Sequence, residues 1–385
     1  MTAGTASLPQ QKVLPTDSAV LQQAVRLAGE SLTLSQPNPR VGCLITNTGE
    51  QLIGQGHTQR AGGPHAEVVA LQDAATQGHS VVGATVYVTL EPCSHHGRTA
   101  PCCDALIAAG IKRVVASLAD PNPLVSGRGF ERLRTAGIEV IVGPGAAESR
   151  ELNIGFFSRM IRKTPWVRMK IAASLDGKTA LDNGASQWIT STPARADGHA
   201  WRARACAVLT GIGTVLADNP RLDVRLVDTP RQPHLVLVDS RLEMPLDAHL
   251  FIAGRALYMY AAVPNEAKKA ALEARGATVI YLPGQDTETQ GKVDLSAMLM
   301  DLGKREINEL HVEAGHKLNG SLIREGLVDE FLVYLAPKLL GQGCNMASFG
   351  PLSELSQAIP LEFKSTDMLG PDLRIVARIP GRDQF

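Results

Sequence analysis

Residue types that bind transition metals gather in one part of the sequence. His65 opens the segment HAEVVAL, Cys93 follows a proline in LEPC, and Cys102 follows a proline in APCC. Zinc prefers imidazole and thiolate ligands, and three protein ligands leave one tetrahedral position open for water. Glu67 lies two residues after His65, and this spacing on a helix separates two side chains by about 200°. The pattern therefore predicts a catalytic zinc site in which Glu67 moves protons and does not bind the metal.

The spacing resembles the signature of zinc deaminases, which is H-x-E followed by P-C-x-x-C. Here the eight residues SHHGRTAP, not two, separate the cysteines. The insert brings two histidines and an arginine near the metal, and such side chains bind phosphate oxygens well. A structural zinc site is the alternative; it would need a fourth ligand, for which Cys103, His95 and His96 are candidates. Cys43 is expected in a buried strand.

The composition favours an enzyme that acts on a small molecule. The 385 residues include 38 basic and 38 acidic side chains, so the net charge is zero and indicates no nucleic-acid surface. Six cysteines are too few for a disulfide scaffold, and three of them are clustered as metal ligands would be. No apolar stretch approaches the roughly 20 residues of a membrane span, and the polar N-terminus lacks a signal-peptide pattern. We therefore expect a cytoplasmic location.

Alternating helix and strand patterns must position the candidate ligands. A helix is predicted over 17–34 with Thr16 or Asp17 as its cap, then a hairpin of strands 41–46 and 51–57, then a helix from His65 to about Gln77. The rest of this half is predicted as strands at 84–90, 113–117 and 138–143 and helices at 102–109, 129–136 and 146–162. This alternation predicts a largely parallel sheet covered by helices, with chemistry in the loops at the strand ends.

A second α/β domain is predicted after Lys163, Thr164 and Pro165, and the length of the chain also suggests two domains. Its strands are predicted at 166–177, 206–211, 234–240, 256–262, 277–282, 309–315 and 330–340, and its helices near 192–203, 264–275, 294–302 and 319–325. A terminal hairpin is predicted to turn at Gly370 and Pro371. The predicted organisation is a flexible arm over 1–16, a zinc domain over 17–162 and a second domain over 163–385.

Motifs in both halves resemble one family of enzymes. The first half contains PNPRVGCLI, AGGPHAEVVAL, YVTLEPCSHHGRTAPCCDALI and DPNPLVSGRG, and the second contains KIAASLDGKTA, SQWIT, GIGTVLADNPRLDVR, LVDS and VEAG. These are similar to the bifunctional riboflavin-biosynthesis enzymes, a diaminohydroxyphosphoribosylaminopyrimidine deaminase joined to a 5-amino-6-(5-phosphoribosylamino)uracil reductase. The match runs from about residue 17 to the C-terminus. The resemblance implies a cytidine-deaminase-like three-layer α/β/α domain followed by a dihydrofolate-reductase-like α/β domain.

The resemblance also implies the reactions and the residues that carry them. The reactions would be zinc-dependent hydrolytic deamination of 2,5-diamino-6-(5-phosphoribosylamino)pyrimidin-4-one and NADPH-dependent reduction of the ribosyl side chain to ribityl. Zn²⁺ would be bound by His65, Cys93 and Cys102, with Glu67 as the proton donor. Substrate contacts would be Asn38, His57, His95 and Arg98 in the first half, and Ser186, Arg202, Leu222, Arg225 and Glu313 in the second. NADPH contacts would be Ala172, Trp188, Thr214, Asp218, Ser240, Gly315, His316, Lys317, Leu318, Asn319, Gly320 and Ser321.

A glycine-containing turn and several charged residues of the second half are consistent with the implied cofactor and substrate contacts. TGIGT lies between a strand and a short helix, where glycines let backbone amides approach a phosphate, although such turns are common without a ligand. Arg202 and Arg225 together favour a phosphate clamp. Lys170 and Asp176 fit either the rim or the interior of a site.

Two residues depart from the family pattern. His316 stands where a small residue or proline is expected after EAG, which could alter the cofactor loop, and Ala100 interrupts a pair of prolines before Cys102. Neither departure removes a predicted ligand.

Two other functions stay open at the level of sequence. One is a single-activity deaminase that acts on another aminopyrimidine or on a nucleic-acid base through a local basic patch, with a C-terminal domain that only binds a nucleotide. The other is a zinc-stabilised interaction module without catalysis. For the bifunctional deaminase and reductase we expect a homodimer or higher homo-oligomer, because symmetric dimers are the commonest assembly. We expect neither a nucleic-acid nor a membrane partner.

Overall fold

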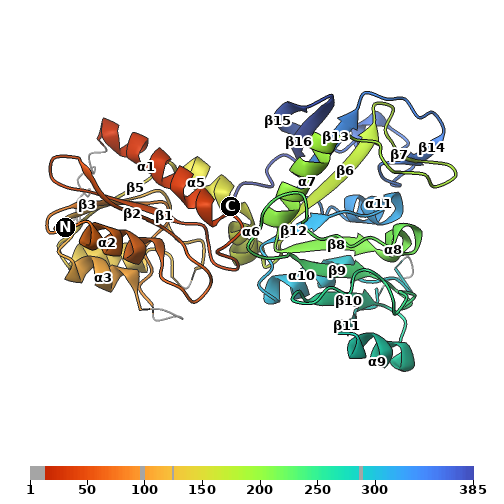
Figure 1. Ribbon diagram of the computed structural model, residues 1–385, viewed down its shortest axis with the longest axis horizontal. Coiled ribbons are helices and arrows are strands. Elements are labelled where there is room, and N and C mark those ends of the chain that lie inside the picture. The colour runs from red at the N-terminus through yellow and green to blue at the C-terminus, as the bar shows by residue number, and fades with distance from the viewer. Residues whose placement is uncertain (1–13, 96–99, 124, 286–288) are drawn as a thin grey trace, which may run out of the picture. The chain divides into compact units, whose positions relative to one another are not determined.

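The computed structural model describes residues 14–95, 100–123, 125–285 and 289–385, and the chain divides into two units, Met1–Phe157 and Ser158–Phe385 (Figure 1). The division falls inside helix α6 (Ile154–Arg162), close to the predicted domain limit at 162/163. Both units are α/β, as predicted from the alternation of elements. In the described part of the chain, no helix has the length and apolar character needed to cross a membrane.

Unit 1 is built on a five-stranded sheet with the order β2-β1-β3-β4-β5. Strand β1 (Gly42–Thr46) runs antiparallel to β2 (Leu52–His57) and to β3 (Thr85–Val88), which confirms the predicted hairpin. Strands β3, β4 (Arg113–Ala116) and β5 (Glu139–Val142) are parallel to one another. The parallel strands end at one edge, where the loops that follow them can share a site.

Helices cover both faces of this sheet (Figure 1). On one face, α1 (Pro15–Ala28) lies so close to β1 that a Cβ on Gly42 would stand 2.0 Å from the Ala24 carbonyl oxygen. On the other face, Gly54 and Gly56 of β2 make the same kind of approach to the backbone of α2 (Ala66–Thr76). The remaining helices are α3 (Cys102–Ala108), α4 (Arg128–Thr135) and α5 (Ala146–Leu152). Glycine thus sets the close spacing of the layers.

Two helix predictions in this unit are wrong in detail. Helix α1 begins at Pro15, not after a cap at Asp17; the Asp17 carboxylate instead accepts the Leu14 N–H (2.8 Å) from inside the first turn. It ends at Ala28 and is followed by a short 3₁₀ turn, so it stops before the predicted limit at 34. The helix predicted over 146–162 is two helices, because Asn153 interrupts it and its side chain bonds both the N–H and the C=O of Arg40.

Unit 2 is built on a nine-stranded sheet with the order β11-β10-β9-β8-β12-β6-β13-β16-β15. The first seven strands in this order are parallel: β11 (Ala277–Tyr281), β10 (Leu257–Ala261), β9 (His234–Val238), β8 (Ala207–Gly211), β12 (Glu309–Val312), β6 (Trp166–Ser174) and β13 (Glu330–Ala336). Strands β15 (Glu362–Leu369) and β16 (Asp372–Arg378) form the predicted terminal hairpin. A separate pair, β7 (Lys178–Leu181) with β14 (Gly343–Asn345), was not predicted, since neither strand has an apolar pattern.

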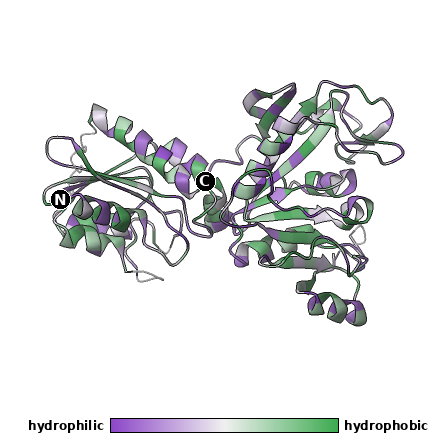
Figure 2. Cartoon of the chain, viewed as in Figure 1, coloured by the Kyte–Doolittle hydropathy of each residue, from purple (hydrophilic) through white to green (hydrophobic). Residues whose placement is uncertain are grey.

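The helices of unit 2 bury apolar side chains against this sheet, whose central strands are largely green in Figure 2. The helices are α7 (Thr192–Arg204), α8 (Ile212–Asp218), α9 (Glu266–Ala274), α10 (Leu295–Lys304) and α11 (His316–Arg324). Met298 of α10 and Leu322 of α11 pack in one core cluster, and Val215 of α8 and Leu272 of α9 in another. Helix α11 begins at His316, before the predicted residue 319, because the chain turns directly from β12 into the helix at Gly315.

A cluster of charges is buried at the start of β6. The Arg168 guanidinium is 1 % exposed and pairs with Glu309 (3.0 Å) and with Glu330. Arg378 from β16 also bonds Glu330 (2.7 Å), and Arg204 from α7 bonds Glu309 (2.7 Å). Burial of charge is tolerated here because every carboxylate has two cationic partners.

Candidate active sites

Three side chains converge in unit 1. His65 caps the start of α2, Cys93 lies in the loop after β3, and Cys102 is the first residue of α3. The His65 Nδ1 atom lies 3.2 Å from the Cys102 Sγ and 3.6 Å from the Cys93 Sγ. Within the described part of the chain, these are the residues of the His, Cys, Asp and Glu types that could hold a metal together. The sequence motif and the fold therefore select the same three residues.

The donor atoms fit a zinc ion. Zinc bonds to nitrogen and sulfur in a tetrahedron would hold the two kinds of donor about 3.5 Å apart, close to the distances seen here. The Cys102 backbone N–H also donates to the Cys93 sulfur (3.3 Å), a bond that stabilises a thiolate. Hydrogen bonds from Cys102 and His65 lower the pKa of the Cys93 thiol, against the effect of burial. The set is therefore suited to one cation that leaves a coordination position open.

Glu67 lies in the first turn of α2 and is 4 % exposed. Its carboxylate is outside the group of three metal donors, as the sequence predicted from the helical angle. Burial, and then the charge of Cys93, raise the pKa of Glu67 from 4.5 to about 7. A carboxyl group with a pKa near neutrality can both accept and donate a proton at physiological pH, which is the requirement for a proton shuttle.

The second cysteine of the APCC motif has a different environment. Cys103 is fully buried, and its Sγ donates to the carbonyl oxygens of Pro92 (3.2 Å) and Gly129 (3.5 Å). It is thus a structural thiol and not the fourth ligand that a structural zinc site would need. Cys43 is buried in β1, as expected. His95 is exposed in the loop after Cys93, while His96 lies outside the described residues.

A buried carboxylate that sequence reasoning missed supports the metal loop. Glu91, two residues before Cys93, accepts backbone N–H groups from Asp120 (3.0 Å), Gly127 (2.9 Å) and Gly129 (2.8 Å). It therefore ties the motif LEPC to the motif DPNPLVSGRG. A Cβ on Gly129 would lie 2.1 Å from the Pro92 carbonyl oxygen, so only glycine fits there. The three donors to Glu91 lie 29 to 38 residues later in the chain, so no local spacing in the sequence indicated this role.

The other residues predicted to bind substrate in unit 1 lie in loops or at strand ends. Asn38 lies before β1, and His57 ends β2, where its Nδ1 is 3.2 Å from the Ser31 hydroxyl. His95 follows the metal loop. Arg98 lies outside the described residues. Among the described residues, no hydrogen bond or ion pair joins Asn38, His57 or His95 to Glu67, so their assignment stays a prediction.

In unit 2, the predicted residues lie mainly at the carboxyl edge of four adjacent parallel strands. Ser240 follows β9, Thr214 follows β8, Glu313 follows β12, and Ala172 lies near the end of β6. These strands are neighbours in the order β9-β8-β12-β6. Parallel α/β sheets bind ligands at this edge because the turns into the following helices lie there. The topology thus brings together residues that are far apart in sequence.

Arg202 and Glu313, both predicted to contact substrate, bond each other. The Arg202 guanidinium makes a two-pronged pair with the Glu313 carboxylate, at 2.7 and 3.0 Å. The Lys170 ammonium lies 3.7 Å from the same carboxylate, which places this residue at the site and not on a remote rim. Although burial raises it, the charges of Arg202 and Lys170 hold the pKa of Glu313 well below its usual value. The carboxylate is therefore ionised and fixed in position.

The predicted cofactor residues include the starts of two helices. Gly315 precedes α11, which contains His316–Ser321, and Gly211 precedes α8, which contains Thr214 and Asp218. A Cβ on Gly315 would be 3.7 Å from the Thr214 hydroxyl oxygen, so the two helix starts are neighbours. Exposed N–H groups at helix N-termini suit the diphosphate of a dinucleotide. Asp176 instead accepts the N–H groups of Leu340 (3.1 Å) and Gly341 (2.7 Å) and so holds a loop.

Trp188 is 59 % exposed, and the Arg195 guanidinium stacks 4.5 Å above its ring. Ser186 lies two residues earlier in the same loop. An exposed, supported indole gives an apolar surface for a cofactor ring. Among the described residues, no hydrogen bond or ion pair joins Ser186 or Trp188 to Glu313, so both assignments stay predictions.

Two residues that sequence reasoning missed contact the predicted ones. His199 lies three residues before Arg202 on α7, and its Nδ1 accepts the Arg225 backbone N–H (3.1 Å). Asp223 lies between Leu222 and Arg225 and pairs with the Arg225 side chain (2.7 Å). The spacing of His199 and Arg202 on one helix face could have revealed the first.

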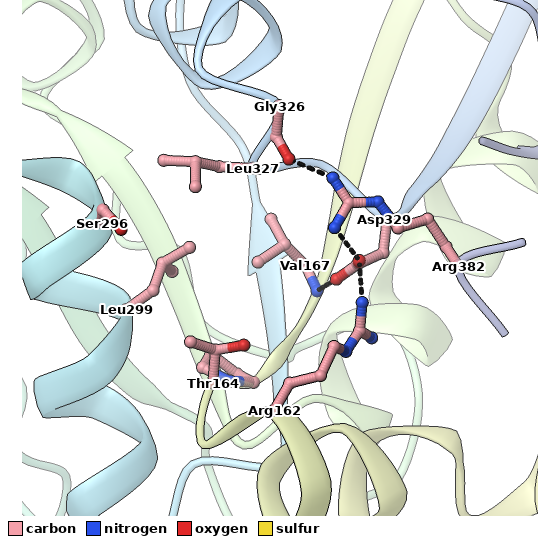
Figure 3. A pocket seen from close by; sticks show the side chains of 10 residues that line it. Arg162, Thr164, Val167, Ser296, Leu299, Gly326, Leu327, Asp329 and Arg382 are labelled. Atoms are coloured by element: carbon pink, nitrogen blue, oxygen red, sulfur yellow. Dashed lines mark hydrogen bonds and ion pairs between the residues drawn. The ribbon is translucent and has the colours of Figure 1, made fainter. Parts of the chain in front are cut away.

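A separate small pocket in unit 2 contains none of the predicted residues (Figure 3). In its wall the Asp329 carboxylate accepts the Val167 N–H (2.8 Å) and pairs with Arg162 (2.9 Å), and Arg382 lies 3.8 Å away. Arg382 also bonds the Gly326 carbonyl. Asp329 therefore joins Arg162, β6 and Arg382 of the C-terminal segment, and we interpret this pocket as a structural tie between β6 and that segment.

Family models match both units. The model described as the cytidine and deoxycytidylate deaminase zinc-binding region matches residues 14–118, and the model described as the RibD C-terminal domain matches residues 165–375. The metal donors and Glu67 lie in the first match, and the Arg202–Glu313 pair lies in the second.

Similar proteins match over nearly the whole chain. The riboflavin biosynthesis protein RibD of Escherichia coli (strain K12) is 44 % identical over 366 residues, covering 93 % of this chain and 98 % of the relative. RibD of Aquifex aeolicus (strain VF5) is 40 % identical over 359 residues, covering 93 % and 97 %. Solved structures of Acinetobacter baumannii RibD (38 % identity, TM-score 0.84) and of a Thermotoga maritima deaminase/reductase (31 % identity, TM-score 0.82) each cover 94 % of this chain and 98 % of the other. The similarity thus includes both units in the same order.

Proposed function

The chain belongs to the RibD family of bifunctional riboflavin-biosynthesis proteins. We propose that the site in unit 1 carries out the deamination and the site in unit 2 the reduction. The protein is an enzyme with a zinc-dependent deaminase domain and an NADPH-dependent reductase domain, each with the fold predicted for it, and its substrate is a small-molecule pyrimidine. The observation that carries the assignment is the convergence of His65, Cys93 and Cys102 in front of a buried glutamate.

In unit 1, the proposed reaction is hydrolytic deamination of 2,5-diamino-6-(5-phosphoribosylamino)pyrimidin-4-one. His65, Cys93 and Cys102 would hold zinc, and a bound zinc ion would make a nucleophile of water available at neutral pH. Glu67 takes a proton from the attacking water and gives a proton to the leaving amine, which departs as ammonia. Burial of Glu67 favours this role because it keeps the carboxyl group ready to exchange a proton. Asn38, His57, His95 and Arg98 are proposed to bind the pyrimidine and the ribose phosphate.

In unit 2, the proposed reaction reduces the ribosyl side chain of the deaminated product to ribityl. NADPH supplies the hydride when bound, and the protein orients the reactants. The proposed substrate contacts are Ser186, Arg202, Leu222, Arg225 and Glu313. The proposed cofactor contacts are Ala172, Trp188, Thr214, Asp218, Ser240 and the start of α11 from Gly315 to Ser321. The fixed, ionised Glu313 supports this assignment, because a rigid carboxylate can hold sugar hydroxyl groups in one orientation.

The finer statements about organisation are proposals as well. We assign the deaminase to 17–162 and the reductase to 163–385, and we place the enzyme in the cytoplasm. Of the arm predicted over 1–16, residues 1–13 lie outside the described residues, and Pro15 and Thr16 belong to α1. The neutral net charge argues against a polynucleotide partner. A homodimer or higher homo-oligomer is supported by exposed apolar side chains near the edge strand β15, among them Leu355 (94 % exposed), Phe363 (71 %) and Met368 (64 %).

The test combines metal analysis with two activity assays on the wild type, Glu67→Ala and Arg202→Ala. We expect Glu67→Ala to keep its zinc and its NADPH oxidation from pre-deaminated substrate but to lose ammonia release. We expect Arg202→Ala to release ammonia normally and to lose NADPH oxidation. Normal ammonia release by Glu67→Ala would show that the assigned proton shuttle is wrong. A wild type that deaminates but never oxidises NADPH would support the single-activity alternative.

A further inference from the structure

The segment Arg221–Arg225 follows α8 without belonging to a helix or strand, yet its main chain is held at every residue. Leu222 has a φ of 48°, so the chain bends sharply here. Side chains from four other places bond the backbone of this segment: Arg255 to the carbonyls of Arg221 and Leu222, Arg202 to that of Asp223, Gln232 to both polar groups of Val224, and His199 to the N–H of Arg225. The segment is therefore a rigid platform.

Two arginines on this platform share one carboxylate. Arg221 Nε lies 2.9 Å from one oxygen of Asp223, and Arg225 Nη1 lies 2.7 Å from the other. The Asp223 side chain is 10 % exposed, whereas those of Arg221 and Arg225 are 61 % and 49 % exposed. Asp223 therefore bonds one nitrogen of each guanidinium group, and both arginine side chains are exposed enough to offer their other N–H groups to a ligand.

The surrounding charges are not balanced. The charges that act most strongly on His199 and Arg255, which hold the segment, are the guanidinium groups of Arg202, Arg221 and Arg225 and the carboxylates of Asp223 and Glu313. With Arg255 itself, four guanidinium groups meet two carboxylates here, and one of these, Glu313, also pairs with Lys170. Arg255 is buried, and its Nε has no hydrogen-bond partner among the described residues. An ion pair formed only for stability would not gather this excess of positive charge. A bound dianion would compensate it.

We propose that Arg221 and Arg225 form a two-arginine clamp for the terminal phosphate of the substrate in the reductase site, and that Asp223 is the positioning residue that sets their separation. This inference rests on the proposed function, in which Arg225 alone of the two arginines contacts substrate. Arg221 is thus a further specificity residue, which selects the phosphorylated over the dephosphorylated compound. A planar guanidinium suits this task because it offers paired N–H donors to phosphate oxygens.

The test is steady-state kinetics of NADPH oxidation with two substrates, 5-amino-6-(5-phosphoribosylamino)uracil and its dephosphorylated counterpart. For Arg221→Ala we expect the KM of the phosphorylated substrate to rise about five- to tenfold with little change in kcat. The kcat/KM for the dephosphorylated compound should stay at the wild-type value. Asp223→Asn should show the same split, and both variants should be inhibited more weakly by inorganic phosphate. Arg275→Ala, an exposed arginine at the end of α9, is the matched control.

Tryptophan fluorescence and unchanged ammonia release identify variants that are folded. If folded Arg221→Ala discriminates between the two substrates as well as the wild type does, the proposal that Arg221 binds the phosphate is wrong, while the proposed reductase function is unaffected. If Arg221→Ala lowers kcat for both substrates equally, its role is structural and the proposal is also overturned. If the wild type oxidises NADPH with neither substrate, the proposed function fails, and the clamp fails with it.

Discussion

Acidification should destabilise unit 2 through His199, and glutamine at this position should remove that part of the pH dependence. His199 is 5 % exposed, and its Nδ1 accepts the N–H of Arg225, which only an unprotonated nitrogen can do. Burial, and then the charges of Arg202 and Arg225, lower the pKa of His199 from 6.5 to about 4. The folded protein therefore keeps this ring neutral at pH values where an unfolded chain would protonate it.

The size of the effect follows from these two pKa values. Since the folded-state pKa is the lower one, the unfolded chain binds one more proton between pH 6.5 and about 4. The stabilisation is complete above pH 6.5 and is lost progressively as the pH falls toward the folded-state pKa. For one group with these values, lowering the pH from 8 to 5 costs about 2 kcal/mol of unfolding free energy.

The tryptophans make the measurement specific to this unit. All three, Trp166, Trp188 and Trp201, lie in unit 2, so their fluorescence during urea unfolding reports on this unit alone. The wild type and His199→Gln are compared at pH 8 and pH 5; a glutamine oxygen can still accept the Arg225 N–H. The wild type should lose about 2 kcal/mol more than the variant, because all other titrating groups are shared. Equal losses in the two proteins would refute the buried neutral histidine.

Three further predictions concern unit 1. Cys103→Ala should retain zinc by elemental analysis whereas Cys102→Ala should lose it, because of these two neighbouring cysteines only Cys102 has its sulfur beside His65; equal metal contents would contradict this. Dialysis against a chelator should abolish ammonia release and leave NADPH oxidation from pre-deaminated substrate intact, and zinc should restore the first activity; loss of both activities would show that the reductase also depends on the metal. Gly129→Ala should lower deaminase activity about 10- to 100-fold in an ammonia assay, because its Cβ would displace the Pro92 carbonyl next to the metal loop. Wild-type activity in this variant would mean that the loop adapts without cost.

The metal site was predictable because its information is local. His65 begins a helix, and Cys93 and Cys102 stand after prolines at a strand end and a helix start, so the motif and its structural context are adjacent in sequence. The hairpin β1–β2 and the terminal hairpin were predictable for the same reason, since alternation and turn residues mark them. Their contacts form between neighbours in the chain.

Other features depend on residues that are distant in sequence. Asn153 breaks the predicted helix only because its side chain finds the backbone of Arg40 on another element. Likewise, His199 reaches the reductase site only because the fold brings α7 beside Arg225, 26 residues further along the chain, and a single histidine carries no such indication by itself. Strands β7 and β14 pair across more than 160 residues, and neither has an apolar pattern. The sequence does not predict a feature when contacts between distant parts of the chain determine it.

The buried charges around Arg168 constrain how this protein can evolve. Replacing one of Arg168, Glu309, Glu330 or Arg378 by a neutral residue strands an opposite charge in the interior, which costs about 3–5 kcal/mol. Replacing a complementary pair by apolar residues of similar volume avoids that cost. Among descendants of this chain, these positions should therefore change together or not at all, and intermediate genotypes with a single exchange should be rare.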